Sequence, residues 1–116
     1  MSNTISGVSL DARNAQAAAS FWAEALGRSV APGADAQNAV IEGDPAVPGS
    51  RIGFHQVPED KTVKNRMHLD LITTDLDAEV QRLVALGATT LNEIDNGARW
   101  TTMADPEGNE FDVIAG

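Results

Sequence analysis

Residues 100–111 read Trp-Thr-Thr-Met-Ala-Asp-Pro-Glu-Gly-Asn-Glu-Phe, and this stretch decides the fold. The segments on either side of 105–109, residues 98–103 and 110–114, have the alternating apolar and β-branched character of strands. Asp, Pro, Gly and Asn, which form 105–109 together with Glu107, are the residues that favour tight turns. The stretch therefore predicts two neighbouring strands joined by a short turn.

Two amphipathic helices are predicted upstream of this hairpin. Asn14 is a suitable N-cap for a helix over residues 15–26, whose apolar residues recur at helical spacing, and Gly27 is a natural residue to end it. Asp75 and Gly87 play the same parts for a second helix. We expect Phe21 and Trp22 to belong to the core, and Leu76, Val80, Leu83 and Val84 to form the buried stripe of the second helix.

The chain contains an internal repeat. The Leu-Gly pairs that end the two helices lie 60 residues apart, and their caps lie 61 residues apart. One strand is predicted before each helix and three strands after it. The predicted strands cover residues 5–10, 28–31, 37–42 and 51–57 in the first half, and 67–72, 88–94, 98–103 and 110–114 in the second.

This order predicts an α+β fold built from two βαβββ modules. We expect a single domain over residues 1–116, with module one at about 4–57 and module two at about 66–115. The polar residues 58–65 are the expected linker.

Charge and composition exclude several classes of function. With 17 acidic and 8 basic residues the net charge is −9, which disfavours nucleic-acid binding. No apolar stretch approaches the roughly 20 residues of a membrane span, so no membrane partner is expected. The chain has no cysteine and shows no signal peptide at its start, so we expect a cytoplasmic protein.

Several segments carry a resemblance to the vicinal oxygen chelate (glyoxalase/bleomycin resistance/dioxygenase) superfamily, and to its glyoxalase-like subgroup in particular. These segments are Phe21-Trp22 with Leu26-Gly27, Arg66 to Leu71, Leu86-Gly87-Ala88 and, most specific, Trp100 to Phe111. The resemblance implies curved mixed sheets that enclose a small-molecule pocket, and it implies a homodimer.

The resemblance also implies where a divalent metal would bind, at the first and last strand of each module. His68 stands at the expected distance before Asp75. Asp112 stands where a Glu is usual, and Glu110, two residues earlier, is a substitute. Imidazole and carboxylate groups are ordinary ligands of such ions.

The corresponding positions of module one are weaker. Counting back from Asn14 gives Gly7 or Val8, neither of which has a ligating side chain. The last strand offers His55 and Gln56, which point to opposite faces, and the sequence leaves open which of them faces the pocket. The predicted metal site, His68 and Asp112, is therefore incomplete, and a divalent metal is an alternative rather than the preferred cofactor.

The remaining candidate residues line the expected pocket. Asp70 shares a face with His68, and Trp100 alternates with Thr102, so all are predicted pocket residues together with His55, Gln56, Glu110 and Asp112. Trp100 would offer an aromatic wall.

Three functions remain open. The first is a glyoxalase-like enzyme without the usual complete metal site, in which His68 is the catalytic acid–base and Asp70 or Asp112 orients it. The second is a non-catalytic binder of drugs or metabolites, as in bleomycin resistance. The third is a divalent-metal lyase, isomerase or dioxygenase.

Overall fold

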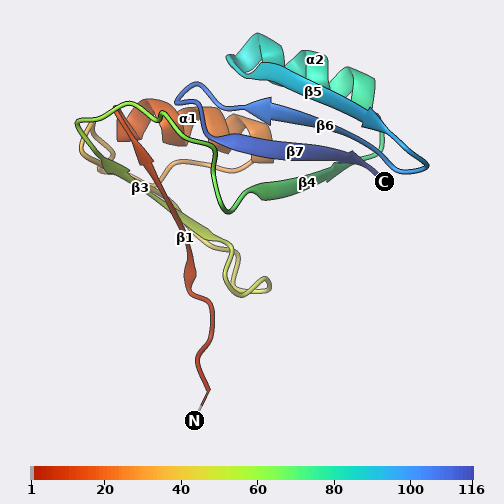
Figure 1. The fold of residues 1–116 in the computed structure, drawn as a ribbon. Coiled ribbons are helices and arrows are strands. Elements are labelled where there is room, and N and C mark those ends of the chain that lie inside the picture. Colours follow the sequence, from red (N-terminus) through yellow and green to blue (C-terminus); the bar gives the residue numbers. More distant parts are fainter. Residues whose placement is uncertain (1) are drawn as a thin grey trace. The chain divides into compact units, whose positions relative to one another are not determined.

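The computed structural model describes residues 2–116 and divides into two compact units, one ending at Asp60 and one beginning at Lys61 (Figure 1). Each unit contains one helix and one sheet. The boundary falls inside the predicted linker. No helix in the described part of the chain is long and apolar enough to cross a membrane.

The first unit consists of β1 (Gly7–Ala12), α1 (Ala15–Leu26), β2 (Asn38–Ile41) and β3 (Arg51–Gln56). The sheet has the order β1-β3-β2, with β1 parallel and β2 antiparallel to β3. Such a mixed arrangement follows from the helical crossover between β1 and the strands after it.

The strand predicted at residues 28–31 is wrong. Only Val30 forms an isolated bridge, to Ile41, supported by a hydrogen bond of 2.8 Å from Ala31 N to Val40 O. Pro32 follows at once and has no N–H to donate, and Gly33 turns the chain away with φ of 90°. The segment therefore leaves the sheet after a single bridge.

Helix α1 has the predicted ends and the predicted core residues. The Asn14 side chain accepts a hydrogen bond from Ala17 N, and Gly27 ends the helix in the left-handed conformation. Phe21 and Trp22 are 5% and 1% exposed, and their rings meet edge to face with centroids 5.3 Å apart. Both aromatic rings of α1 therefore belong to the core of the first unit.

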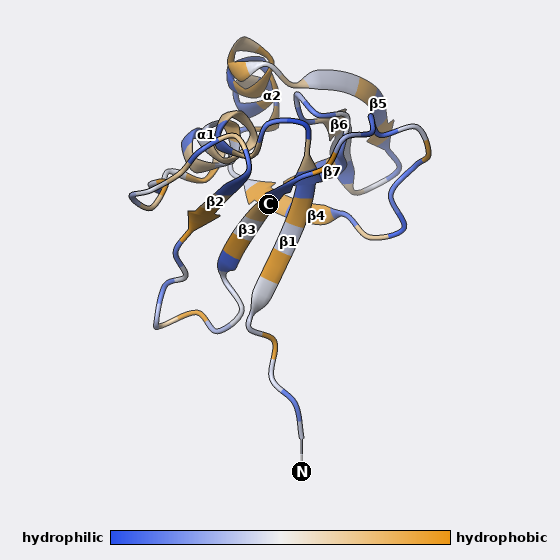
Figure 2. Cartoon of the chain, turned by 90° about the vertical axis from the view of Figure 1, so that its left-hand side faces the viewer, coloured by the Kyte–Doolittle hydropathy of each residue, from blue (hydrophilic) through white to orange (hydrophobic). Residues whose placement is uncertain are grey.

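Hydrophobic and hydrophilic residues alternate along β1, as its banding in Figure 2 shows. The face that packs against α1 carries Ile52 and Phe54, which are 5% and 0% exposed. The opposite face carries Ser9, Asp11 and His55, all exposed. This period of two separates a core face from a polar face.

The second unit consists of β4 (Leu69–Thr73), α2 (Leu76–Leu86), β5 (Thr89–Asp95), β6 (Arg99–Ala104) and β7 (Glu110–Ala115). Its strand order is β4-β7-β6-β5, with β4 parallel to β7 and the other pairs antiparallel. Helix α2 packs against β5, β6 and β7 (Figure 1). The fully buried residues of this unit include Leu83, Met103, Phe111 and Val113.

Two sequence expectations for this unit need correction. The first strand begins at Leu69 rather than Met67, so His68 lies just before β4 and Met67 is 81% exposed. The stripe on α2 is narrower than predicted, because Leu76 and Leu83 are buried while Val84 is 47% exposed. A short helix on one side of a four-stranded sheet contacts it along a narrow line, which leaves the flank of the stripe in solvent.

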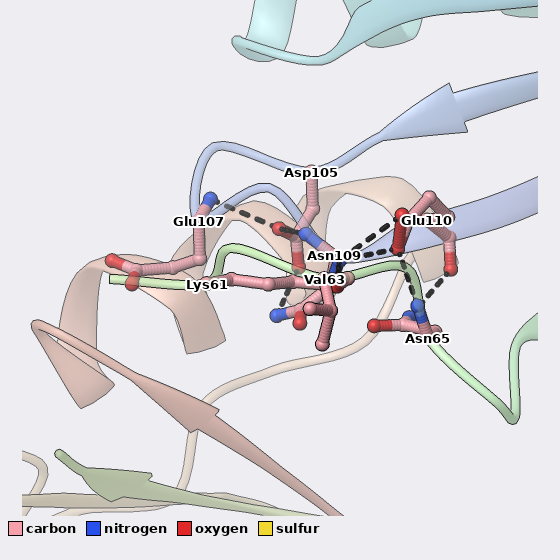
Figure 3. A network of polar contacts seen from close by, with 7 residues as sticks. All are labelled: Lys61, Val63, Asn65, Asp105, Glu107, Asn109 and Glu110. Carbon is pink, nitrogen blue, oxygen red and sulfur yellow. Dashed lines mark hydrogen bonds and ion pairs between the residues drawn. The ribbon is translucent and has the colours of Figure 1, made fainter. Parts of the chain in front are cut away.

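The turn between β6 and β7 is held by Asp105, which is 4% exposed. Its carboxylate accepts hydrogen bonds from the backbone N–H groups of Glu107 and Asn109, each 2.9 Å long (Figure 3). Gly108 adopts φ of 90°, which glycine tolerates best. The carboxylate therefore accepts hydrogen bonds from turn N–H groups that have no partner in the sheet.

Glu110, the first residue of β7, is bound by the segment that leads into the second unit (Figure 3). Lys61 Nζ lies 2.7 Å from Glu110 Oε1, and Asn65 donates from its backbone N–H to the same oxygen at 3.0 Å. Burial alone would raise the pKa of Glu110, but the hydrogen bonds from Lys61 and Asn65 outweigh it and hold the pKa below its ordinary value. The segment 61–65 is thereby fastened to the sheet.

We expect Glu110→Gln to lower the free energy of unfolding by about 1–3 kcal/mol at neutral pH, because it leaves Lys61 without its carboxylate. A lowered folded-state pKa stabilises the native state above the unfolded pKa, and this contribution is lost as pH falls through the folded value. The difference between wild type and variant, measured by urea unfolding, should therefore begin to shrink as pH falls past the ordinary glutamate pKa of about 4.3, and it should vanish once pH is below the lowered folded-state pKa.

Lys64→Met is the matched control, because Lys64 lies in the same segment and is exposed. Lys61→Met should resemble Glu110→Gln, whereas Lys64→Met should resemble wild type. Equal unfolding free energies for all four proteins would show that the contact contributes nothing to stability.

Candidate functional site

A row of polar side chains crosses the second sheet on the face opposite α2. Asp70 of β4 stands directly beside Asp112 of β7, and Asp112 stands beside Thr102 of β6. Asn92 of β5 continues the row next to Thr102. We call these four residues the polar row. Because register neighbours on one face lie about 5 Å apart, the row brings together residues distant in the sequence.

His68 lies at one end of this row. Its Nδ1 is 2.9 Å from Asp70 Oδ1 and 3.6 Å from Asp112 Oδ2. Thr102 Oγ1 donates to Asp112 Oδ1 at 2.6 Å and orients that carboxylate. The side chain of Asp112 is 17% exposed, whereas that of His68 is 44% exposed, so the imidazole is the more accessible group.

The donor set of the second unit suits a divalent cation. His68, Asp70 and Asp112 each present one ligand atom, and these atoms lie within 4.8 Å of one another. Three protein ligands with further open positions are the usual minimum of a catalytic metal site. Asp70, which the sequence predicts as a pocket residue and as a group that orients His68, supplies the third ligand atom of this set.

Glu110 is not available as the substitute ligand. Both of its carboxylate oxygens accept hydrogen bonds, one from Lys61 Nζ at 3.0 Å and one from Asn65 N at 3.0 Å. Releasing it would leave the ammonium of Lys61, whose side chain is only 19% exposed, without its ion pair.

In the first unit His55 and Gln56 lie on opposite faces of the sheet. His55 lies on the face away from α1, where its Nδ1 is 3.2 Å from Asn38 Oδ1. Gln56 belongs to the other face, and its side chain donates to the carbonyl of Arg13 at 3.1 Å. Only His55 therefore shares the polar face of its sheet.

The residue of β1 that corresponds to His68 has no side chain to offer. Val57 N donates to the carbonyl of Ala12 at 2.9 Å, and Gly116 N donates in the same way to the carbonyl of Thr73 at 2.8 Å, so the ends of β1 and β4 correspond. Five residues before Ala12 stands Gly7, and five residues before Thr73 stands His68.

Trp100 lies half-buried on the same face as Thr102 and directly beside Ile114. It also borders a groove of 660 Å³ between the start of α2 and the β5–β6 hairpin. Of the predicted site residues, Trp100 alone lines this groove. The groove is therefore separate from the cluster around His68.

Comparison with known proteins places this geometry in a family. A family model described as a glyoxalase-like domain matches residues 7–114. A comparison with curated proteins found no match to the sequence.

Solved structures share the fold at low sequence identity. A glyoxalase/bleomycin resistance protein/dioxygenase family enzyme from Burkholderia phytofirmans is 18% identical, with a TM-score of 0.75 over 97% of this chain and 98% of that one. A possible glyoxalase from Bacillus cereus is 19% identical, with a TM-score of 0.74 over 98% and 100%.

A fosfomycin resistance protein from Listeria monocytogenes, in complex with Mn(II) and dihydroxypropylphosphonic acid, is 15% identical, with a TM-score of 0.76 over 100% and 92%. These likenesses show the expected α+β fold with two mixed, curved sheets. The chain belongs to the glyoxalase-like domain family of the glyoxalase/bleomycin resistance/dioxygenase, or vicinal oxygen chelate, superfamily.

Proposed function

We propose that this protein is an enzyme that binds a small organic molecule on the polar row and transfers a proton through His68. The observation that carries the proposal is the 2.9 Å contact between His68 Nδ1 and Asp70 Oδ1. An ionised carboxylate only accepts hydrogen bonds, so Nδ1 carries the proton in this contact. The lone pair of the neutral ring is then on Nε2.

His68 Nε2 is free to act on a ligand. It makes no hydrogen bond with any residue between 2 and 116, and the His68 side chain is 44% exposed. A general base must reach the proton that it abstracts, and an accessible imidazole nitrogen with a fixed ring meets this requirement. Asp70 is the positioning residue for that ring.

Asp112 supports the same role from a second direction. When Nε2 accepts a proton the ring becomes a cation, and the carboxylates of Asp70 and Asp112 both face it. Fixed negative charges beside a developing imidazolium stabilise it, as in the Ser-His-Asp triad. The Thr102 hydroxyl holds Asp112 in place for this interaction.

A divalent-metal enzyme is the second candidate, favoured by the three donor atoms that lie within 4.8 Å of one another. His68, Asp70 and Asp112 would hold the ion. A bound divalent ion polarises a ligand oxygen and lowers the pKa of bound water. The Mn(II) in the structurally similar Listeria protein makes this candidate worth testing, although the likeness itself concerns the fold.

The hydrogen bond to Asp70 predicts the tautomer of His68. Long-range ¹H–¹⁵N correlation spectra should show the neutral ring protonated at Nδ1 in wild type. Asp70→Ala should increase the Nε2-protonated form, because the tautomer follows the hydrogen bond that the other nitrogen makes. His55, which contacts Asn38 in the first unit, is an internal control and should not change. A wild-type His68 protonated only at Nε2 would remove the basis of the proposal.

Metal content separates the two candidates. We expect protein purified without chelators, and then offered Zn, Mn, Ni or Fe, to retain less than one ion per chain, because two carboxylates and one imidazole are already hydrogen-bonded to their neighbours. Retention of about one ion per chain by wild type and by His55→Ala, and its loss in His68→Ala and Asp112→Asn, would establish the metal site instead.

A further inference from the structure

A second row of side chains runs beside the polar row on the same face. Ile72 of β4 pairs with Ile114 of β7, Ile114 with Trp100 of β6, and Trp100 with Ile94 of β5. All four positions are apolar, so we call them the apolar row. They stand two residues along each strand from the polar row, which corresponds to roughly 7 Å.

No element of the second unit covers the apolar row. Helix α2 packs on the opposite face, where Thr101, Met103 and Val113 are buried. Ile72 is 77% exposed, and Ile94, Trp100 and Ile114 are each half-buried. Contiguous apolar side chains left accessible to solvent are a common mark of a binding surface.

The charge of the polar row indicates which chemical group of a ligand would bind there. Asp70 and Asp112 stand side by side, and Asp112 accepts a hydrogen bond only from the neutral hydroxyl of Thr102 apart from its contact with His68. Two adjacent carboxylates repel an anion and attract a cation. Lys61, which could have neutralised this region, is engaged by Glu110.

We infer that the site takes an amphiphilic small molecule whose apolar body lies along Ile72, Ile114, Trp100 and Ile94 and whose amine group lies at Asp70 and Asp112. This inference deepens the proposed function and rests on it, since it concerns the ligand of the same face. The spacing of the rows requires about 7 Å between the polar group and the centre of the apolar body.

A homologous series of primary amines, from ethylamine to octylamine, tests the inference. Binding is followed by the amide shifts of β4, β6 and β7 in NMR titrations of the full chain. Affinity should rise about fourfold per methylene once the alkyl chain reaches the apolar row, since each buried methylene contributes a roughly constant free energy. Alkanoates of the same lengths should bind at least tenfold more weakly.

Variants locate the apolar contact. Ile72→Thr and Ile114→Thr keep β-branched side chains that suit a strand, and either should reduce the gain per methylene to below twofold. Val84→Thr is the matched control. Val84 is an exposed residue of α2, which packs on the opposite face of the sheet, so this variant should behave as wild type. Ile72→Thr is the variant that keeps the test valid if Ile114→Thr unfolds, because Ile72 is largely exposed.

The outcomes distinguish this inference from the proposed function. If amines bind at Asp70 and Asp112 with an affinity that does not depend on alkyl chain length, the apolar row does not bind the ligand. This result would overturn the inference and leave the proposed function intact. Absence of any amine binding, or equal binding of alkanoates, would overturn the inference, while the tautomer of His68 still tests the proposed function separately. A wild-type dimer that Ile114→Thr converts to monomer would also overturn it, by showing that a second copy covers the row.

Discussion

The parallel pairing of β4 with β7 is the constraint on which the rest of the second unit depends. It puts Leu69 beside Phe111 on one face and Asp70 beside Asp112 on the other. A shift of one residue would exchange the two faces, burying carboxylates under α2 and exposing the core. The burial of Phe111, which is 1% exposed, therefore enforces the same register that assembles the candidate site.

The Lys61–Glu110 contact decides which carboxylates remain available on that face. Glu110 and Asp112 lie two residues apart on β7, and from composition alone either could act on a ligand. The ammonium of Lys61 and the N–H of Asn65 occupy Glu110, whereas Asp112 meets a hydroxyl and an imidazole. The entry segment thus gives Glu110 a structural role and leaves Asp70 and Asp112 as the acidic groups beside His68.

Much of this arrangement could be predicted from the sequence because local chemistry specifies it. Asn14, Asp75, Gly27 and Gly87 cap the helices as their residue types suggest. The family resemblance of their segments predicts His68 and Asp112 as neighbours, and His68 Nδ1 lies 3.6 Å from Asp112 Oδ2. The strand predicted at 28–31 is wrong because Pro32 and Gly33 turn the chain away after the single bridge of Val30.

Properties that depend on pairing could not be predicted in this way. The position of Asp70 beside Asp112 follows from cross-strand register, which is set by the burial of Phe111. The engagement of Glu110 depends likewise on Lys61, which is 49 residues away in the chain. Each of these contacts joins segments whose relative placement only the folded sheet defines.

The two units carry similar polar faces but different chemistry. In the first, Asp11 pairs with His55 across the strands, and the His55 ring contacts the neutral amide of Asn38. In the second, the ring of His68 contacts the carboxylate of Asp70 and lies near that of Asp112. An amide can orient an imidazole but brings no charge to stabilise its protonated form. Both can fix a tautomer, but of the two rings only that of His68 has a carboxylate within hydrogen-bonding distance to favour the cation that proton transfer creates. For this reason the proposed chemistry belongs to His68 rather than to His55.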